Sequence, residues 1–493
     1  MLTRPRVFHP LSLRAFSASR LQVRCVSSTG NQRDGDASLV TGGAAKTTSY
    51  YPPVELPVQR QQGTVPPPLS LLPLSSVVRS LLLLTASSTP IFLKPSIAAL
   101  QVLANPKLPL FDVAKNPVLN WLVKRTLYAQ FNAGENRAEV QRSIKQIKDL
   151  GCKGVILGYA REMLASEGQV SETEEHAAIT GKLDIETWKK GTLDTVEMAT
   201  EGDFVALKVT GIGRQAVELL KQNKEPSEDI ANAIKEVCDA AIARNVRLLV
   251  DAEEQAVQPG IESWTLKYQK YCNKHTPNRA IMYGTYQAYL RSAPATISRH
   301  LAIAREEGYT LGVKMVRGAY MKTEPRHVIW ATKEDTDACY DGIVADLLTQ
   351  KYGSTLRPTA SEVSQPFPSV NLIIATHSQD SVRKAHAIRR QQAENGQPRI
   401  ELSYAQLQGM ADEVSCELAQ YRHGGIDGPA AAAPLETPLA YKLLTWGTTK
   451  ECMGFLMRRA MENTEAMTRT RHSKEAMAEE LRRRFRSFIQ GSP

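Results

Sequence analysis

Polar and charged residues stand at the carboxyl ends of short apolar segments along this chain of 493 residues. They are Lys208, Asp251, Gln287, Lys314, Arg317, Thr376, His377 and Gln406, and Glu253 and Glu254 follow Asp251 closely. A group with several cations and few acids suits an anionic ligand or cofactor, because ammonium and guanidinium groups form charge-assisted hydrogen bonds to carboxylate and phosphate. Taken singly, each residue could be an ordinary polar residue at the end of a strand.

A second candidate group is the adjacent pair Arg458 and Arg459, followed by Glu462. On a helix, Glu462 lies three residues from Arg459 and four from Arg458, so it can pair with one of them and orient it. Two guanidinium groups aimed at a pocket would bind a carboxylate in a bidentate manner. Without further context, a solvated basic helix face is the simpler interpretation.

Three other patterns do not support a site. Gly211, Gly213 and Ala216 form a nominal GxGxxA dinucleotide-binding pattern, but the acid expected on a following strand about 20 residues later is missing. The nine histidines form no HExxH or HxH motif, so no metal site is predicted. The seven cysteines form no short pair, which argues against a zinc ribbon or a disulfide framework.

Eight short apolar segments separated by helical patterns would position the strand-end residues. They are Gly154–Leu157, Phe204–Val209, Arg247–Val250, Ala280–Tyr283, Leu311–Val316, Asn371–Ala375, Ile400–Ser403 and Tyr441–Thr445. Buried strands that alternate with helices predict a parallel sheet, and eight such units favour a closed (β/α)8 barrel, with the reactive residues at the carboxyl ends of its strands. An open doubly wound sheet remains the alternative. Residues 137–150 carry apolar residues at helical spacing and predict an amphipathic helix.

The net charge of +10 comes from the two ends of the chain. Residues 1–65 carry eight basic and three acidic residues, and residues 458–486 carry nine and five. The excess is therefore terminal, which argues against a nucleic-acid partner. Residues 482–486 are expected to form a solvated basic tail near anionic lipid.

The first 33 residues contain six arginines and no acid, a composition typical of a mitochondrial presequence. A basic disordered tail is the alternative. Residues 34–68 are rich in Gly, Thr, Gln and Pro and predict a disordered lead-in. An N-terminal helical region at 69–135, a barrel at 136–467 and a basic C-terminal tail at 468–493 complete the expected organisation. No apolar run reaches a spanning length, and the patch at 77–84 predicts a core helix or, as the less favoured alternative, a helix on a membrane surface.

As a set, the strand-end motifs resemble mitochondrial proline dehydrogenase (proline oxidase), of a fungal-like type. The motifs are Leu-Lys-Val-Thr-Gly at 207–211, Val-Asp-Ala-Glu-Glu at 250–254, Tyr-Gln-Ala-Tyr-Leu at 286–290, Lys-Met-Val-Arg-Gly-Ala-Tyr at 314–320, Ala-Thr-His-Ser at 375–378, Gln-Leu-Gln-Gly-Met at 406–410 and Phe-Leu-Met-Arg-Arg-Ala-Met-Glu-Asn at 455–463. Each motif alone is weak, whereas seven in order from about residue 128 to residue 467 are specific.

The resemblance implies a distorted (β/α)8 TIM-like barrel with an N-terminal helical extension, and FAD held non-covalently over the strand ends. L-proline would lose hydride from C5 to flavin N5 and give Δ1-pyrroline-5-carboxylate, the first step of proline catabolism to glutamate. Electrons would pass to ubiquinone at the matrix side of the mitochondrial inner membrane, which the protein would contact peripherally.

The resemblance also assigns roles by position. Arg458 and Arg459 would bind the proline carboxylate with Lys208 beside them, and Glu462 would orient the pair. Lys208 and Asp251 would be the catalytic residues near substrate and flavin, with water or Asp251 as the base. The flavin contacts would be Gln287, Lys314, Arg317, Gly318, Ala319, Tyr320, Thr376, His377 and Gln406.

Two positions depart from the family pattern, since Leu443 and Phe455 stand where the family usually has tyrosines that line the substrate pocket. Two alternatives follow: oxidation of hydroxyproline or another cyclic amine on the same barrel, and a catalytically silent mitochondrial barrel that acts as a binding protein. The silent barrel is disfavoured because the chain retains Lys208, Asp251, Arg458, Arg459 and Glu462.

Overall fold

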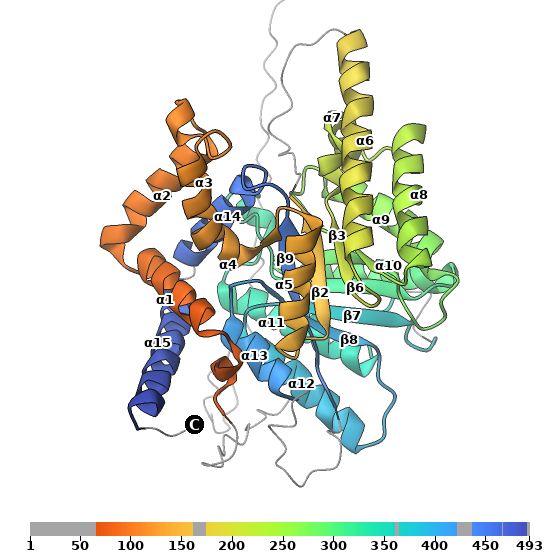
Figure 1. Ribbon diagram of the computed structural model, residues 1–493. Coiled ribbons are helices and arrows are strands. Elements are labelled where there is room, and N and C mark those ends of the chain that lie inside the picture. The colour runs from red at the N-terminus through yellow and green to blue at the C-terminus, as the bar shows by residue number, and fades with distance from the viewer. Residues whose placement is uncertain (1–65, 161–173, 360–363, 422–435, 466, 491–493) are drawn as a thin grey trace, which may run out of the picture. The chain divides into compact units, whose positions relative to one another are not determined.

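The computed structural model describes residues 66–160, 174–359, 364–421, 436–465 and 467–490, all within one compact unit (Figure 1). The predicted presequence and nearly all of the predicted lead-in lie outside these residues. At the centre are parallel strands surrounded by helices. The strands are β1 (Asn132–Gly134), β2 (Gly154–Tyr159), β3 (Phe204–Leu207), β4 (Arg247–Val250), β5 (Met282–Gln287), β6 (Leu311–Val316), β7 (Val370–Ala375), β8 (Leu402–Leu407) and β9 (Leu439–Trp446).

Strands β2 to β9 close into a barrel. Each strand pairs in parallel with the next in sequence, and β9 pairs with both β8 and β2. In this register Leu157 of β2 lies opposite Leu444 of β9 and Val205 of β3. The predicted (β/α)8 barrel is therefore confirmed, and the open doubly wound sheet is wrong because β9 has partners along both of its edges.

All eight predicted segments overlap a barrel strand, and two strands extend farthest beyond their predicted ends. Strand β5 reaches Gln287 and β8 reaches Leu407, four residues past the expected ends. These extensions contain Thr, Tyr and Gln, all buried near the barrel mouth, so the apolar pattern ends before the strand does. The short strand β1 pairs in parallel with the carboxyl end of β9. It is not predicted from the sequence, because three residues are too few to show the period-two pattern of a strand.

The alternation of side chains along each strand divides the apolar core in two. Phe204, Leu249, Ile373 and Tyr441 belong to a cluster inside the barrel, while their sequence neighbours pack outward against the helices. Because side chains repeat every second residue, Lys208 continues the inward-facing series of Phe204. Inward-facing residues at the carboxyl ends of the strands therefore meet at the mouth of the barrel.

The surrounding helices follow the strands in turn. They are α5 (Arg137–Asp149), α6 (Glu174–Met198), α7 (Arg214–Lys221), α8 (Glu228–Ala243), α9 (Gln258–Asn273), α10 (Ala293–Glu306), α11 (Lys333–Thr349), α12 (Gln379–Glu394) and α13 (Asp412–Gln420). Helix α5 buries Val140, Ile144 and Ile147, as its spacing predicts, and begins where the Asn136 side chain accepts a hydrogen bond from the backbone of Glu139.

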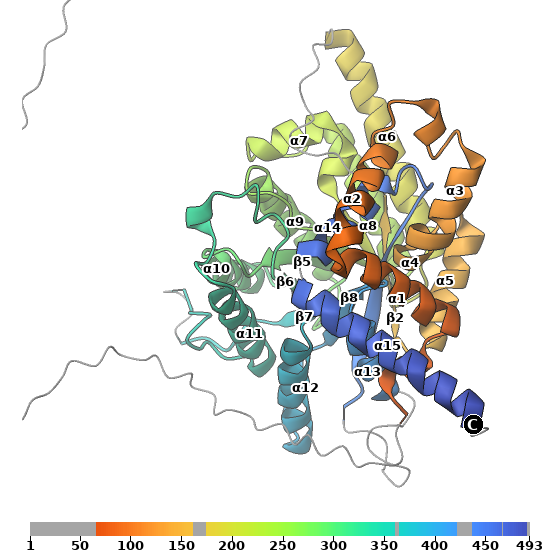
Figure 2. The same cartoon turned by 90° about the vertical axis from the view of Figure 1, so that its left-hand side faces the viewer.

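Helices from both ends of the chain form the extension beside the barrel (Figures 1 and 2). They are α1 (Leu74–Ser88), α2 (Pro90–Ala104), α3 (Pro117–Val123), α4 (Ala129–Phe131), α14 (Met453–Glu465) and α15 (Met467–Gln490). Short helical turns occur at Pro68–Leu71, Pro109–Phe111, Lys124–Tyr128, Val209–Ile212 and Arg326–Val328. Helix α1 packs along α15, and α2 packs on α14. The predicted N-terminal helical extension is confirmed.

The expected solvated C-terminal tail is wrong for the residues up to Gln490, which continue α15. Arg484 donates to the backbone oxygens of Leu69, Ser70 and Leu72, the last at 2.8 Å, and it pairs with buried Glu480 at 2.6 Å. Burial alone would raise the pKa of Glu480, but hydrogen bonds from Arg483 and Arg484 lower it. Charge composition suggested a free tail because it cannot show that these arginines hold the chain segment before α1.

No single helix of the described residues is long and apolar enough to cross a membrane. Helices α1 and α2 meet the length and composition criteria only as a pair, with a bend of 100° between them.

Candidate functional site

Four charged side chains gather at the mouth of the barrel: Lys208 after β3, Asp251 after β4, Lys314 within β6, and Arg459 on α14. We call them the mouth cluster. Lys208, Lys314 and Arg459 all act electrostatically on Asp251, although they come from separate elements. With three cations and one anion, the mouth cluster favours an anionic ligand.

Lys314 and Asp251 form an ion pair within the mouth cluster. Lys314 Nζ donates to Asp251 Oδ1 at 2.7 Å, and the two side chains are 6% and 21% exposed. Lys314 lies beside Ile373 of β7 in the register and so faces the barrel interior, where a lysine requires a charged partner. Burial alone would raise the pKa of Asp251, but the nearby cations and the Lys314 hydrogen bond lower it. Asp251 is therefore a carboxylate at neutral pH.

Helix α14 brings Arg459 to this mouth. Arg459 is buried, its guanidinium lies 4.8 Å from the centre of the Phe455 ring, and it donates to Glu462 Oε1 at 2.5 Å. Glu462 thus pairs with the arginine three residues before it. Arg458 is partly buried on the same helix, and successive helical side chains are turned by about 100° from one another. The two arginines therefore approach their surroundings from different directions.

A second group surrounds Arg317 at the outer edge of the mouth. Its guanidinium donates to Asp337 Oδ1 at 2.6 Å, to Thr376 Oγ1 at 2.7 Å and to Ser381 Oγ at 2.9 Å. It also lies 4.4 Å from the centre of the Tyr340 ring. Arg317 thereby joins the ends of β6 and β7 to helices α11 and α12. Asp337 and Ser381 were not predicted, since only the packing of α11 and α12 brings them to Arg317.

Gln406 faces away from the barrel axis. It belongs to the outward series of β8, its Oε1 accepts from Ser415 Oγ at 3.0 Å, and its Nε2 donates to the Thr376 oxygen at 3.2 Å. The Gln406 amide connects β8 to α13 and β7, and the assignment of Gln406 to flavin binding stays a prediction. His377 Nε2 accepts from the Leu407 backbone at 3.2 Å, so neutral His377 carries its proton on Nδ1.

Gln287 ends β5 on the inward face and donates from Nε2 to the Glu253 backbone oxygen at 3.0 Å. The Glu253 carboxylate accepts from Thr210 Oγ1 at 2.8 Å and is buried. These contacts fix the turn after β4, which carries Asp251. Thr210 was not singled out from the sequence, because its hydroxyl gains significance only through its contact with Glu253.

The segment after β6 is shaped by Gly318. Its φ is +135°, and a Cβ at this position would lie 2.0 Å from the ring of Tyr289. Glycine is thus required there by both conformation and packing. Ala319 is exposed and Tyr320 is partly exposed beyond it, so the structure places both at the rim rather than in the mouth cluster.

The two departures from the family pattern lie on different elements. Leu443 faces the barrel interior, where it packs against the same inner cluster as Ala206 and Ala375. Phe455 is buried on α14 beneath Arg459. Tyr441, two residues before Leu443, packs deep in the barrel, where its ring centre lies 5.0 Å from that of Phe204. Tyr441 therefore does not occupy the place of the missing tyrosine.

The nominal dinucleotide pattern has a structural explanation. Gly213 has a φ of +136°, and a Cβ there would lie 2.8 Å from the Asp184 Cβ of α6. The glycine permits this close approach at the start of α7.

A cavity of about 80 Å³ lies beside the mouth, between α9, α10 and the end of β5. Its lining includes Gln258, Glu262, Thr285 and Gln287. Burial raises the pKa of Glu262, the acid in this lining. The cavity adjoins the predicted site through Gln287.

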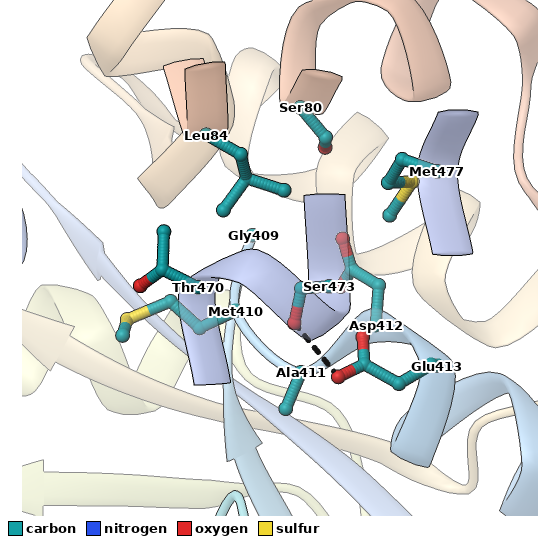
Figure 3. A pocket seen from close by; sticks show the side chains of 10 residues that line it. All are labelled: Ser80, Leu84, Gly409, Met410, Ala411, Asp412, Glu413, Thr470, Ser473 and Met477. Atoms are coloured by element: carbon teal, nitrogen blue, oxygen red, sulfur yellow. Dashed lines mark hydrogen bonds between the residues drawn. The ribbon is translucent and has the colours of Figure 1, made fainter. Parts of the chain in front are cut away.

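Figure 3 shows a smaller cavity, of about 20 Å³, between α1, α15 and the turn after β8. Ser473 donates to Glu413 Oε1 across it at 2.8 Å. Its volume suits about one water molecule. None of the residues predicted for the site lines it, so it belongs to the attachment of the terminal helices.

The sequence of this chain is similar to those of known proteins. A protein family described as proline dehydrogenase matches residues 140–472. Among curated proteins, "Proline dehydrogenase 1, mitochondrial" of Caenorhabditis elegans is 30% identical over 308 residues, covering 62% of this chain and 46% of the relative. "Hydroxyproline dehydrogenase" of Bos taurus is 25% identical over 400 residues, covering 74% and 82%.

Solved structures resemble this chain in fold. Proline utilization A from Bdellovibrio bacteriovorus, inactivated by N-propargylglycine, has a TM-score of 0.56 at 15% identity. The similarity covers 77% of this chain and 37% of that one. The match of the family model to residues 140–472 confirms the family suggested by the strand-end motifs. Because the family match extends over about two thirds of its length, this chain belongs to the proline dehydrogenase family.

Proposed function

We propose that this protein oxidises L-proline to Δ1-pyrroline-5-carboxylate, with FAD as its cofactor and ubiquinone as the electron acceptor. The observation that carries the proposal is the mouth cluster, which places Lys208, Lys314 and Arg459 around Asp251 in a barrel of this family. The carboxylate of an amino acid and the pyrophosphate of a dinucleotide cofactor both suit such a cationic site.

The residues at the mouth fit FAD in two respects. Lys208, Lys314 and Gln287 offer donors to a ring with several acceptor atoms, and cations suit a pyrophosphate. The inward residues Ala206 and Ala375 are short, so the upper layer of the barrel leaves room for a planar ring. When bound, FAD would supply the two-electron acceptor, and the chain would supply binding and orientation.

Arg459 and Arg458 would bind the substrate carboxylate. Arg459 is buried and oriented by Glu462, so its guanidinium is held before substrate arrives. Lys208 would add a positive charge from the other side of the mouth. A fixed carboxylate positions the ring carbon that is oxidised, and this positioning is the main contribution that a protein makes to such a transfer.

Asp251 is better suited to holding charges in place than to accepting the proton of the substrate amine. Its pKa is lowered despite burial, and a weakly basic carboxylate is a poor general base near neutral pH. Its carboxylate already accepts from Lys314. We therefore favour water as the proton acceptor, with Asp251 orienting Lys314.

A second candidate substrate is 4-hydroxyproline. The bovine relative named hydroxyproline dehydrogenase aligns with 74% of this chain and 82% of its own length, more than the Caenorhabditis elegans protein does. The departure at Leu443 leaves this candidate open, but the family model that matches residues 140–472 is described as proline dehydrogenase. L-proline is therefore the preferred substrate.

We also propose a location at the matrix side of the mitochondrial inner membrane, with peripheral contact and removal of residues 1–33. Several relatives carry "mitochondrial" in their names, and the arginine-rich, acid-free N-terminus agrees with import. The barrel at 136–467 would be the catalytic part.

The test is an anaerobic titration of the purified protein. Bound flavin should be visible in the absorption spectrum, and L-proline should bleach it, whereas 4-hydroxyproline should do so poorly. Bleaching by hydroxyproline alone would favour the second candidate, and a protein without flavin after expression in flavin-rich medium would overturn both. A flavin that neither substrate bleaches would support a silent barrel. Arg458→Met should retain flavin and require more proline.

A further inference from the structure

Exposed apolar side chains are concentrated on the terminal helices. Of the twenty large apolar residues that are exposed in the described parts of the chain, twelve lie within 74–122 and three within 485–489. Surface apolar residues are normally scattered singly, and a contiguous group of them marks an interaction site. Of the other five, four lie on the helices and loops around the barrel, and Met461 lies on α14.

Helix α1 presents one edge to solvent and the other to the protein. Leu74, Val78 and Leu82 follow each other at intervals of four and are all exposed. Val77, on the other side, is fully buried in a cluster that includes Met477 of α15. Since residues four apart lie on the same side of a helix, the exposed residues form a continuous apolar stripe.

Helix α2 continues this surface and lies directly over α14. Its inner side contributes Leu100 to the cluster that contains Phe455 and Leu456. Ile91, at 74% exposed, and Phe92 face outward. One helix therefore separates the exposed surface from the helix that carries Arg459. Figure 2 shows α1, α2 and α15 together on the face turned toward the viewer.

Helix α3 adds a tryptophan with a basic neighbour. Val118 and Trp121 are 74% and 59% exposed, and the Arg125 guanidinium lies 5.6 Å from the centre of the Trp121 ring. Exposed tryptophan beside arginine is typical of the boundary between lipid headgroups and acyl chains. At the end of α15, Phe485 and Phe488 are exposed beside Arg486.

The charge of this surface has one sign. Residues 66–131 contain six basic residues and a single acid, Asp112, which is buried. Lys94, Lys107 and Arg125 are exposed among the apolar side chains. Residues 481–490 contain four arginines and no acid. Such a surface attracts anionic lipid headgroups.

We infer that α1, α2, α3 and the last turns of α15 form one surface that lies on an anionic phospholipid bilayer. The 100° bend between α1 and α2 suits helices that lie in the interface rather than cross it. A second copy of this chain fits less well, because two-fold association would bring basic side chains together. The inference deepens the proposed function, on which it rests for a lipid-soluble electron acceptor, and it would place the bilayer next to α2 and α14.

The test uses flotation of the full-length protein with lipid vesicles. One vesicle preparation is phosphatidylcholine alone, and the other contains phosphatidylcholine and cardiolipin at about 4:1. The surface variant carries Leu82→Ser, Ile91→Ser and Trp121→Ser. The control variant carries Leu183→Ser and Ile242→Ser, which are exposed apolar residues on α6 and α8. All proteins retain residues 1–65, so any lipid affinity of that segment is common to them.

The wild type and the control should float with the cardiolipin vesicles, and the surface variant should bind them at least about tenfold more weakly. Neutral vesicles should bind the wild type at least about tenfold more weakly than anionic ones. Equal flotation of the surface variant and the wild type would overturn the inference. So would a wild type that binds neither vesicle, or one that forms dimers that the surface variant does not form.

Proline-dependent reduction of a soluble dye separates this result from the proposed function. The surface variant should reduce the dye at the wild-type rate, which also shows that it is folded. Lipid binding without dye reduction would refute the proposed function and leave the surface assignment supported. Lys94→Gln with Lys107→Gln should weaken binding to anionic vesicles and leave dye reduction unchanged.

Discussion

Lys314 of β6 and Asp251 after β4 form an ion pair of 2.7 Å across the barrel mouth, over the strand β5 that separates them in the sheet. The pair exists because the barrel is closed and its inward side chains converge. It places a carboxylate among cations, and it holds the buried ammonium of Lys314 in a fixed position.

Removal of both members of this pair should destabilise the protein by less than the sum of the two single removals. Lys314→Met leaves Asp251 without its hydrogen-bonded cation, and we expect a loss of about 2–3 kcal/mol in the free energy of unfolding. Asp251→Asn should cost a similar amount, and the double variant should lose less than the sum. A double-mutant cycle in urea measures this coupling, and additive losses would contradict it.

The contribution of Asp251 to stability should depend on pH in a defined direction. Its pKa is lowered in the folded state, so its stabilising effect is fully present above the pKa of an unfolded aspartate, about 3.9, and is lost as the pH falls through the lower folded value. The difference in unfolding free energy between the wild type and Asp251→Asn should therefore be constant at neutral pH and shrink in acid. A difference that grows as the pH falls would refute this assignment.

The two arginines of α14 should affect substrate binding more than flavin binding. Arg459→Met and Arg458→Met each remove a charged donor to the carboxylate, and the KM for proline should rise about 10- to 100-fold. Glu462→Gln keeps both arginines but weakens the orientation of Arg459, so its KM should rise less. Steady-state kinetics with a flavin absorption spectrum tests all three. Loss of flavin from the arginine variants would show that the pair binds the cofactor.

Arg317 should contribute mainly to the stability of the folded protein. Its guanidinium forms hydrogen bonds to Asp337, Thr376 and Ser381, and lysine cannot reproduce this planar geometry. Arg317→Lys should lower the free energy of unfolding by about 2–3 kcal/mol. The matched control is Arg383→Lys, whose pair with Glu417 is more exposed, and it should cost less than about 1 kcal/mol. Equal effects would mean that the Arg317 contacts add little.

Leu443→Tyr tests the departure from the family pattern. Leu443 faces the barrel interior, and Ala206 and Ala375, which pack against the same inner cluster, have short side chains that leave room in this layer. The tyrosine would add a hydroxyl near the mouth, and we expect the kcat/KM ratio between proline and 4-hydroxyproline to change by about 10-fold. Phe455→Tyr is the companion variant, because that position lies under Arg459. An unchanged ratio in both variants would remove these positions from substrate selection.

The architecture can be predicted from the amino-acid pattern alone. Eight apolar segments predict eight strands, and each overlaps a strand of the barrel, because a strand buried on both faces is apolar wherever it lies. The identities of Lys208, Asp251, Lys314 and Arg459 were also predicted, since strand ends and the motif on α14 can be recognised in order along the chain. The extra length of β5 and β8 could not be predicted from the sequence, because the last residues of these strands are mostly polar and are buried only by the closed barrel.

The contacts of these residues depend on the tertiary structure. Lys314 pairs with Asp251, while Gln406 turns outward to Ser415, although both had been assigned to one cofactor. The difference is the side of the strand each occupies, which depends on register. The arginines near the C-terminus also have contacts that the sequence does not predict. Composition gives their charge. The hydrogen bond from Arg484 to the chain before α1 depends on the packing of two segments that are far apart in the sequence.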